Sequence, residues 1–367
     1  MASVKREETE KVSDLRVVFA GNELQRSRAL ELQFPPMYSP TLVPAIPEDE
    51  RVNSSGLDAL IVVIRRLVSH ISGEYSDPSI PEIAQQEQAN PLLRLAMSHF
   101  DNESQTNLGV AGYHALKAFY GGEKLKAHKL TFMALSEHQL MLKTFWSRER
   151  FLLYQPTFLF RMGDQYEWDF YDYSGEPEEL ARLAARSLVR FKTGNLSEAV
   201  ERRFNPGMLR WMASNMPSVL RVHYTVDKSE PKTMHDLQAI TVDMRHMTKG
   251  SQGYELAEKG SCLTHYGLIA EVRLSRDGKE KDTVRTYAHG GEVISMPAEF
   301  PPTHKELLGE PGASYLLYYG ALASPRVPRE YRIKVLKRNE MSEAIDRQFA
   351  DLVSGSPSGN SAVKSEP

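Results

Sequence analysis

The feature that most constrains the fold is an unbroken apolar run, LDALIVVIRRLVSHI, from Leu57 to Ile71. The run is apolar on nearly every face, and it is too long for an ordinary strand, so it predicts a buried helix despite its β-branched residues. Asp58, Arg65 and Arg66 interrupt the run. A membrane span needs about 20 apolar residues, and no stretch of the sequence reaches that length. We therefore expect a core helix of a soluble protein with no membrane partner.

The hydrophobic period changes along the chain from helical to alternating. Helices are expected near 91–100, 107–120 and 136–150, from Pro177 to about Lys192, and over LSEAVERRF with Ser197 as its cap. Strands are expected in the aromatic segment 151–173 and after residue 217, with a further short strand near Leu15 to Ala20 and an extended loop from Leu32 to Glu50. A helical half followed by a strand-rich half predicts an α+β fold with helices grouped against an antiparallel sheet.

Composition divides the chain into four parts. Residues 1–14 and 354–367 are polar and are expected to be disordered tails, the second being rich in Ser, Gly and Pro. One domain is expected from 15 to 325. Residues 326–353 form a C-terminal extension with a helix near 340–353.

Charge and cysteine content exclude several classes of function. The chain has 45 basic and 48 acidic residues and a formal charge of -3, so nucleic acid and anionic membranes are not favoured partners. The single cysteine, Cys262, excludes an internal disulfide and a cysteine-based zinc site. Neither a metal-binding histidine motif nor a phosphate-binding loop is present, so no metal and no cofactor is expected. The charged amino terminus contains no signal peptide, which predicts an intracellular protein of the cytoplasm or nucleus.

Three blocks of sequence carry a resemblance to a known family. The first is NSSGLDALIVVIRRL, from Asn53 onwards. The second is MPSVLRVHYTV followed by HDLQAITVDM. The third is LTHYGLIAEVRL, then TVRTYAHGGEVI, then ASYLLYYGAL. Taken in this order, the blocks resemble the nucleophile, strand and histidine boxes of the ubiquitin-specific proteases. The resemblance covers roughly residues 50–75 and 215–320, and it implies a papain-like fold in which a helical thumb packs on a sheet called the palm.

The resemblance also implies a role for individual residues. Ser55 stands where the family has its nucleophilic cysteine, His265 where it has its general base, and His289 where it has the third triad residue. Asn53 is the implied oxyanion donor, although it lies closer to Ser55 than the family's spacing. Two of the three triad positions are therefore altered. From the residues alone, Ser55 followed by Asp58 and an apolar run also resembles a helix cap.

Three functions remain open from the sequence. The first is a pseudoenzyme that binds ubiquitin, a ubiquitin-like protein or ubiquitinated proteins without cleaving them. The second is an active deubiquitinating thiol isopeptidase, if Ser55 replaces a natural cysteine. The third is an interaction or scaffold protein that has kept only the fold.

Overall fold

The predicted core helix is the centre of the structure. In the computed structural model α3 spans Ser55–His70, and thirteen of its residues are buried. Each fully buried Leu, Ile or Val contributes about 1.5–3 kcal/mol of transfer free energy, whereas a β-branched residue costs a helix only some tenths of a kcal/mol. Burial therefore decides the conformation of this run. The structure describes residues 14–21, 23–32, 55–71, 77–99, 105–162, 166–170, 175–204, 210–250, 253–260, 262–276, 280–288, 293–295 and 312–322.

The other helices of the first half of the chain range from single turns to the fifteen residues of α6. They are α1 (Leu15–Val18), α2 (Glu23–Leu32), α4 (Pro81–Ala89), α5 (Pro91–Ala96), α6 (Gln105–Phe119), η3 (Ala127–Lys129), α7 (Phe132–Ser136), α8 (Gln139–Thr144) and η4 (Glu149–Phe151). Three more follow later in the chain: α9 (Pro177–Arg186), α10 (Leu196–Glu201) and α11 (Met234–Leu237).

The strands form one large sheet and two smaller ones. The seven-stranded sheet has the order β11-β10-β9-β12-β5-β3, and β6 pairs with β9 beside this path. Its strands are β3 (Leu188–Phe191), β5 (Val219–Thr225), β6 (Ala239–Asp243), β9 (Leu263–Arg273), β10 (Thr283–Tyr287), β11 (Val293–Ser295) and β12 (Ser314–Ala321). A three-stranded sheet contains β2 (Tyr166–Phe170), β1 (Tyr154–Met162) and β4 (Arg210–Ser214), while β7 (Met247–Gly250) pairs with β8 (Gly253–Leu256).

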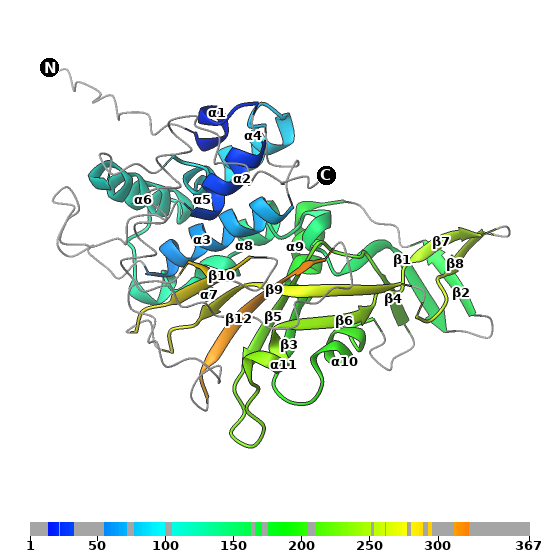
Figure 1. The fold of residues 1–367 in the computed structure, drawn as a ribbon. Helices are drawn as coiled ribbons and strands as arrows, with labels where there is room; N and C mark the ends of the chain where they lie inside the picture. Colours follow the sequence, from blue (N-terminus) through cyan, green and yellow to red (C-terminus); the bar gives the residue numbers. More distant parts are fainter. Residues whose placement is uncertain are drawn as a thin grey trace, which may run out of the picture.

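The seven-stranded sheet has a hydrophobic core on each face. The helices of the first half of the chain and α9 pack on one face, around α3. On the other face α10 and α11 cover β5, β6 and the opposite side chains of β9 and β12. Figure 1 shows this layered arrangement, with α3 above the sheet and α10 and α11 below it. The α+β class predicted from the sequence is confirmed.

Two buried arginines of α3 connect it to its surroundings. The Arg65 Nε atom donates to the carbonyl of Ala96 at 2.6 Å. The Arg66 Nε atom donates to the carbonyl of Tyr287 at 3.0 Å, and its Nη1 atom lies 3.2 Å from a carboxylate oxygen of Glu31. Because buried guanidinium groups need acceptors, these bonds fix how α3 sits against α5, β10 and α2.

The start of the chain departs from the prediction. The expected strand near Leu15 to Ala20 is instead helix α1. Asp14 caps this helix by accepting the backbone N–H of Arg16 at 2.8 Å. The Arg16 side chain is fully buried between Asp14 and Glu87, at 2.6 and 2.7 Å. A long-range ion pair, which local periodicity does not reveal, fixes the segment.

Three later predictions also need correction. The helix that begins at Pro177 ends at Arg186, because the following residues form β3, which pairs in parallel with β5; the sheet is therefore not wholly antiparallel. The helix expected over 136–150 is divided among α7, α8 and η4. Asn195, and not Ser197, caps α10, through its Oδ1 atom and the N–H of Glu198.

Other predicted segments lie outside the described residues. These are the tails, apart from Asp14, the loop after Leu32 and the helix near 340–353. The predicted helices over 91–100 and 107–120 correspond to α5 and α6, and the aromatic segment forms the β1–β2 hairpin.

The first turn of α3 approaches another segment closely at Gly56. A Cβ atom added there would lie 2.2 Å from the carbonyl oxygen of Leu130 and 2.4 Å from the amide nitrogen of Phe132. Both atoms belong to the backbone, so neither can move aside without displacing α7. Gly112 in α6 is a contrasting helical glycine, because its added Cβ would meet only leucine side chains, the nearer being Leu57 at an ordinary 3.6 Å.

Substitutions at these two glycines should change stability in opposite directions. We expect Gly56→Ala to lower the free energy of unfolding by about 2 kcal/mol or more through overpacking. Gly112→Ala should raise it by up to about 1 kcal/mol, because alanine favours a helix. Urea denaturation of both variants measures the two effects. An increase in stability for Gly56→Ala would contradict the close approach.

A histidine caps α8 and makes the fold sensitive to pH. The Nδ1 atom of His138 accepts the backbone N–H of Leu140 at 3.2 Å, which requires an unprotonated nitrogen. The ring lies 4.4 Å from that of Phe119, centroid to centroid. Burial, and then the charge of Lys129, lowers the pKa of His138 below 6.5.

Stability should therefore fall in mildly acidic solution. Below about pH 6.5 the unfolded chain binds a proton that the folded His138 resists, so the free energy of unfolding falls as pH decreases. Burial also lowers the pKa of His223, which adds an effect of the same sign. His138→Asn keeps an N-cap acceptor and removes one titrating group. Urea denaturation at pH 7.5 and 5.5 should show a smaller difference for this variant than for the unaltered chain, and an equal difference would contradict the account.

Candidate functional site

Ser55 is the first residue of α3, and it takes part in a structural contact. Its Oγ atom accepts the backbone N–H of Asp282 at 2.9 Å. The Asp282 carboxylate in turn accepts the N–H of Phe132 at 2.8 Å and that of Ser275 at 2.8 Å. These four residues, Ser55, Phe132, Ser275 and Asp282, form what we call the Asp282 junction. It joins the beginnings of α3 and α7 to the turn between β9 and β10.

The Asp282 junction is largely closed to solvent. Asp282 is 6% exposed. Burial raises the pKa of its carboxyl group, and the two backbone N–H donors act in the opposite direction. A buried carboxylate that holds two main-chain donors is a typical structural bridge, since each donor would otherwise be left without a partner.

His265 lies near the other end of β9. It is the third residue of that strand, and its Nδ1 atom lies 2.8 Å from the Oγ1 atom of Thr241, its cross-strand partner in β6. Its carbonyl oxygen accepts the N–H of Leu322 at 2.8 Å. The residue is half-buried between β6 and the end of β12.

The structure does not bring Ser55 and His265 together. Ser55 is bound at the Asp282 junction, next to Ser275, and Ser275 lies ten positions after His265 along an extended chain. At about 3.3 Å per residue, this corresponds to roughly 30 Å. A nucleophile and its general base must lie within hydrogen-bond reach of each other. In this structure Ser55 and His265 are therefore not placed as a catalytic pair.

The direction of α3 accounts for this separation. The helix starts at the Asp282 junction and ends at His70, whose ring packs on Gly320. Gly320 is the strand partner of Gly267, two residues beyond His265. The carboxyl end of α3, and not its amino end, therefore lies at the end of β9 that contains His265.

The other two predicted site residues, His289 and Asn53, lie outside the described residues. Cys262 is half-buried just before β9, and its carbonyl oxygen accepts the N–H of Met244 at 2.9 Å. It lies at the same end of β9 as His265, far from Ser55.

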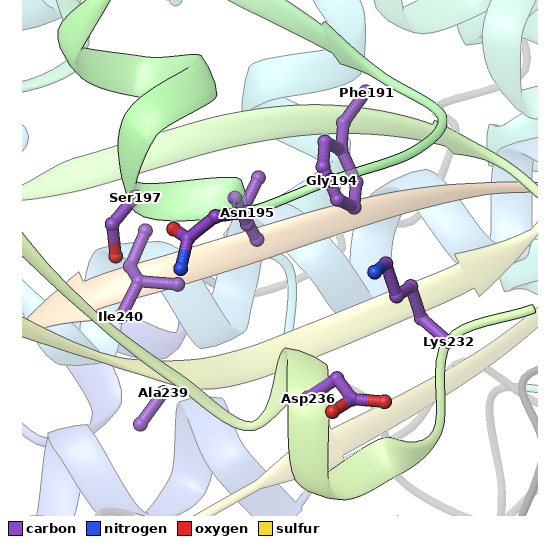
Figure 2. A pocket seen from close by; sticks show the side chains of 9 residues that line it. Phe191, Gly194, Asn195, Ser197, Lys232, Asp236, Ala239 and Ile240 are labelled. Atoms are coloured by element: carbon purple, nitrogen blue, oxygen red, sulfur yellow. The ribbon is translucent and has the colours of Figure 1, made fainter. Parts of the chain in front are cut away.

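A pocket of about 260 Å³ lies on the face of the sheet opposite α3. Its wall comes from the start of α10, the start of α11 and β6, as Figure 2 shows. Phe191, Leu196 and Ile240 provide an apolar floor, and Asn195, Lys232 and Asp236 provide polar groups. The sequence analysis did not identify this pocket. Its only local signal was a capping box in which Thr233 and Asp236 bond to each other's backbone.

Neither a metal-binding cluster nor a membrane-spanning helix is found among the described residues. Within them, no group of three or more His, Cys, Asp or Glu side chains is placed to hold a metal ion. None of the described helices combines the length and the hydrophobicity that crossing a bilayer requires.

Comparison with known proteins provides no identification. No family model matches this sequence, and no curated protein matches it.

Loss of the Asp282 junction should cost stability in a graded way. We expect Ser55→Ala to lower the free energy of unfolding by about 1 kcal/mol, the typical net value of one hydrogen bond. Asp282→Ala leaves the N–H groups of Phe132 and Ser275 without their acceptor and should cost roughly 2–4 kcal/mol. Urea denaturation measures both values. A neutral Asp282→Ala would contradict the bridging role.

Proposed function

We propose that the chain is a protein-binding domain that does not cleave its partner. The observation that carries this proposal is the bond from the Asp282 backbone N–H to the Ser55 Oγ atom, at the far end of β9 from His265. Ubiquitin or a ubiquitin-like protein is the partner to test first, because the sequence resemblance indicates it.

The chemistry of a serine nucleophile supports the absence of cleavage. A serine hydroxyl attacks only when an adjacent base takes its proton. At the Asp282 junction the Ser55 Oγ atom accepts a main-chain N–H, and the imidazole of His265 lies roughly 30 Å away along an extended strand. A cysteine at position 55 would lack the same base.

The arrangement of the strands supports the proposed partner class. The blocks that resemble the ubiquitin-specific proteases correspond to β5, β6, β9, β10 and β12. β5, β12, β9 and β10 are successive neighbours in one sheet, and β6 pairs with β9. Such a continuous sheet fits a palm that has kept its strands. A papain-like fold of the ubiquitin-specific protease type is part of this proposal, with α3 running in the direction that separates the triad positions.

A ubiquitin probe with an electrophilic carboxyl terminus tests the absence of a catalytic centre. We expect no covalent adduct at residue 55, either in the unaltered chain or in Ser55→Cys, because His265, the expected base, is out of reach of residue 55. Gel shift and mass spectrometry detect the adduct. Cys262→Ser, alone and combined with Ser55→Cys, identifies background labelling of the natural thiol. An adduct on the thiol that Ser55→Cys introduces would contradict the proposal.

Titration of isotopically labelled ubiquitin with the unaltered chain tests the partner. We expect saturable chemical-shift changes on one face of ubiquitin, with a Kd between about 1 µM and 1 mM, as for a small transient interface. A ubiquitin conjugate incubated with the chain should remain intact. If no shifts occur with ubiquitin or with ubiquitin-like proteins, the proposed partner class is wrong.

A further inference from the structure

The pocket between α10 and α11 has the size of a single amino-acid residue. At about 260 Å³ it lies below the usual 300–1,000 Å³ of sites for drug-sized ligands. Its apolar floor is built from Phe191, Leu196 and Ile240, which are buried. The exposed lining is mostly polar, so a small polar or charged group with a limited apolar side fits it.

Two donors at the rim of the pocket already converge on a carboxylate. The backbone N–H of Gly194 donates to both oxygens of Glu230 at 3.3 Å, and the Nζ atom of Lys232 donates to the same carboxylate. These two donors lower the pKa of Glu230, Lys232 having the larger effect. The chain's own side chain therefore shows which chemical group this position accepts.

Glu230 is easily displaced from this position. Its side chain is 48% exposed, whereas that of Lys232 is only 13% exposed. An ion pair with an exposed partner contributes little to stability. An incoming carboxylate could therefore replace Glu230 at Lys232 at a small cost to the fold.

Further polar groups face the same space. The Oδ1 atom of Asn195 caps α10, and its Nδ2 amide has no hydrogen-bond partner among the residues that the structure describes. Figure 2 shows this amide and the Nζ atom of Lys232 directed into the pocket. Asp236 uses its Oδ2 atom for Thr233, which leaves Oδ1 as an acceptor at the rim.

We propose that this pocket binds a residue with a free α-carboxylate, either the last residue of a peptide or a free amino acid, by displacing Glu230. Lys232 and Asn195 bind the carboxylate. Asp236 accepts the adjacent N–H, and the floor of Phe191, Leu196 and Ile240 takes an apolar side chain. This inference does not depend on the proposed function, because the pocket lies on the sheet face opposite α3 and its groups are separate from Ser55 and His265.

Binding is measured by NMR titration of the isotopically labelled full chain with three ligands. They are acetyl-Ala-Ala-Leu with a free carboxyl terminus, the same peptide with an amidated terminus, and free leucine. We expect the free peptide or leucine to bind with a Kd of roughly 1 mM, as a ligand of this size allows. The amidated peptide should bind at least about 10-fold more weakly, because the charge-assisted bonds are lost. Whichever of acetyl-Ala-Ala-Leu and free leucine binds more tightly is the proposed source of the carboxylate.

Variants at the rim should change the affinity in opposite directions. Lys232→Met should weaken binding about 10-fold, whereas Glu230→Ala should strengthen it several-fold, because the internal competitor is gone. Asn195→Ser keeps the helix cap, removes the amide donor and should weaken binding several-fold. Lys228→Met, at an exposed neighbouring lysine, is the charge control and should have no effect.

Three results would overturn the inference. The first is the absence of saturable shifts at the pocket with both free carboxylates. The second is equal affinity for the amidated peptide. The third is weaker binding by Glu230→Ala in a variant whose spectrum shows an intact fold.

Discussion

The bond between Ser55 and Asp282 shows where the two halves of the chain meet. α3 is the most deeply buried helix, and it has to be placed lengthwise on the sheet in one of two directions. The Asp282 junction holds its amino end at the β9–β10 turn. The close approach of Gly56 to the backbone of Leu130 leaves no room for a shift there. The opposite end of α3 then necessarily lies near Gly320, on the side of His265.

This direction explains why similar sequence blocks need not form a similar catalytic site. The blocks around β5, β9 and β12 are strands whose pattern reflects burial on two faces, and they do become neighbours. A triad requires more than adjacent strands, because its groups must meet within hydrogen-bond distance. With α3 anchored at Asp282, the helix tip and the imidazole lie at opposite ends of the same strand. Polar groups that can receive a ligand lie instead on the far face, beside Lys232.

Local patterns predicted the parts of the fold that local forces determine. The apolar run of α3 and the alternating β5, β9 and β12 lie where periodicity places them. The prediction of a strand at Leu15 was wrong because the Arg16–Glu87 ion pair, which fixes this segment, spans 71 residues. The prediction of a helix over the residues of β3 was wrong because pairing with β5 overrides helix propensity. The sites could not be predicted because they also depend on long-range contacts. No local signal shows that the Asp282 N–H will reach Ser55, or that Asn195 and Lys232 will share a pocket.

The distance between residues 55 and 262 tests the central claim most directly. Cys262 is natural, half-buried and three residues before His265, so Ser55→Cys gives a chain with two thiols for nitroxide labels. Pulsed electron spin resonance then measures the separation of the labels. The direction of α3 predicts roughly 30 Å or more, from the rise of the extended strand between them. A distribution centred below about 15 Å would place the helix tip beside the imidazole, as a catalytic pair requires, and would contradict the account.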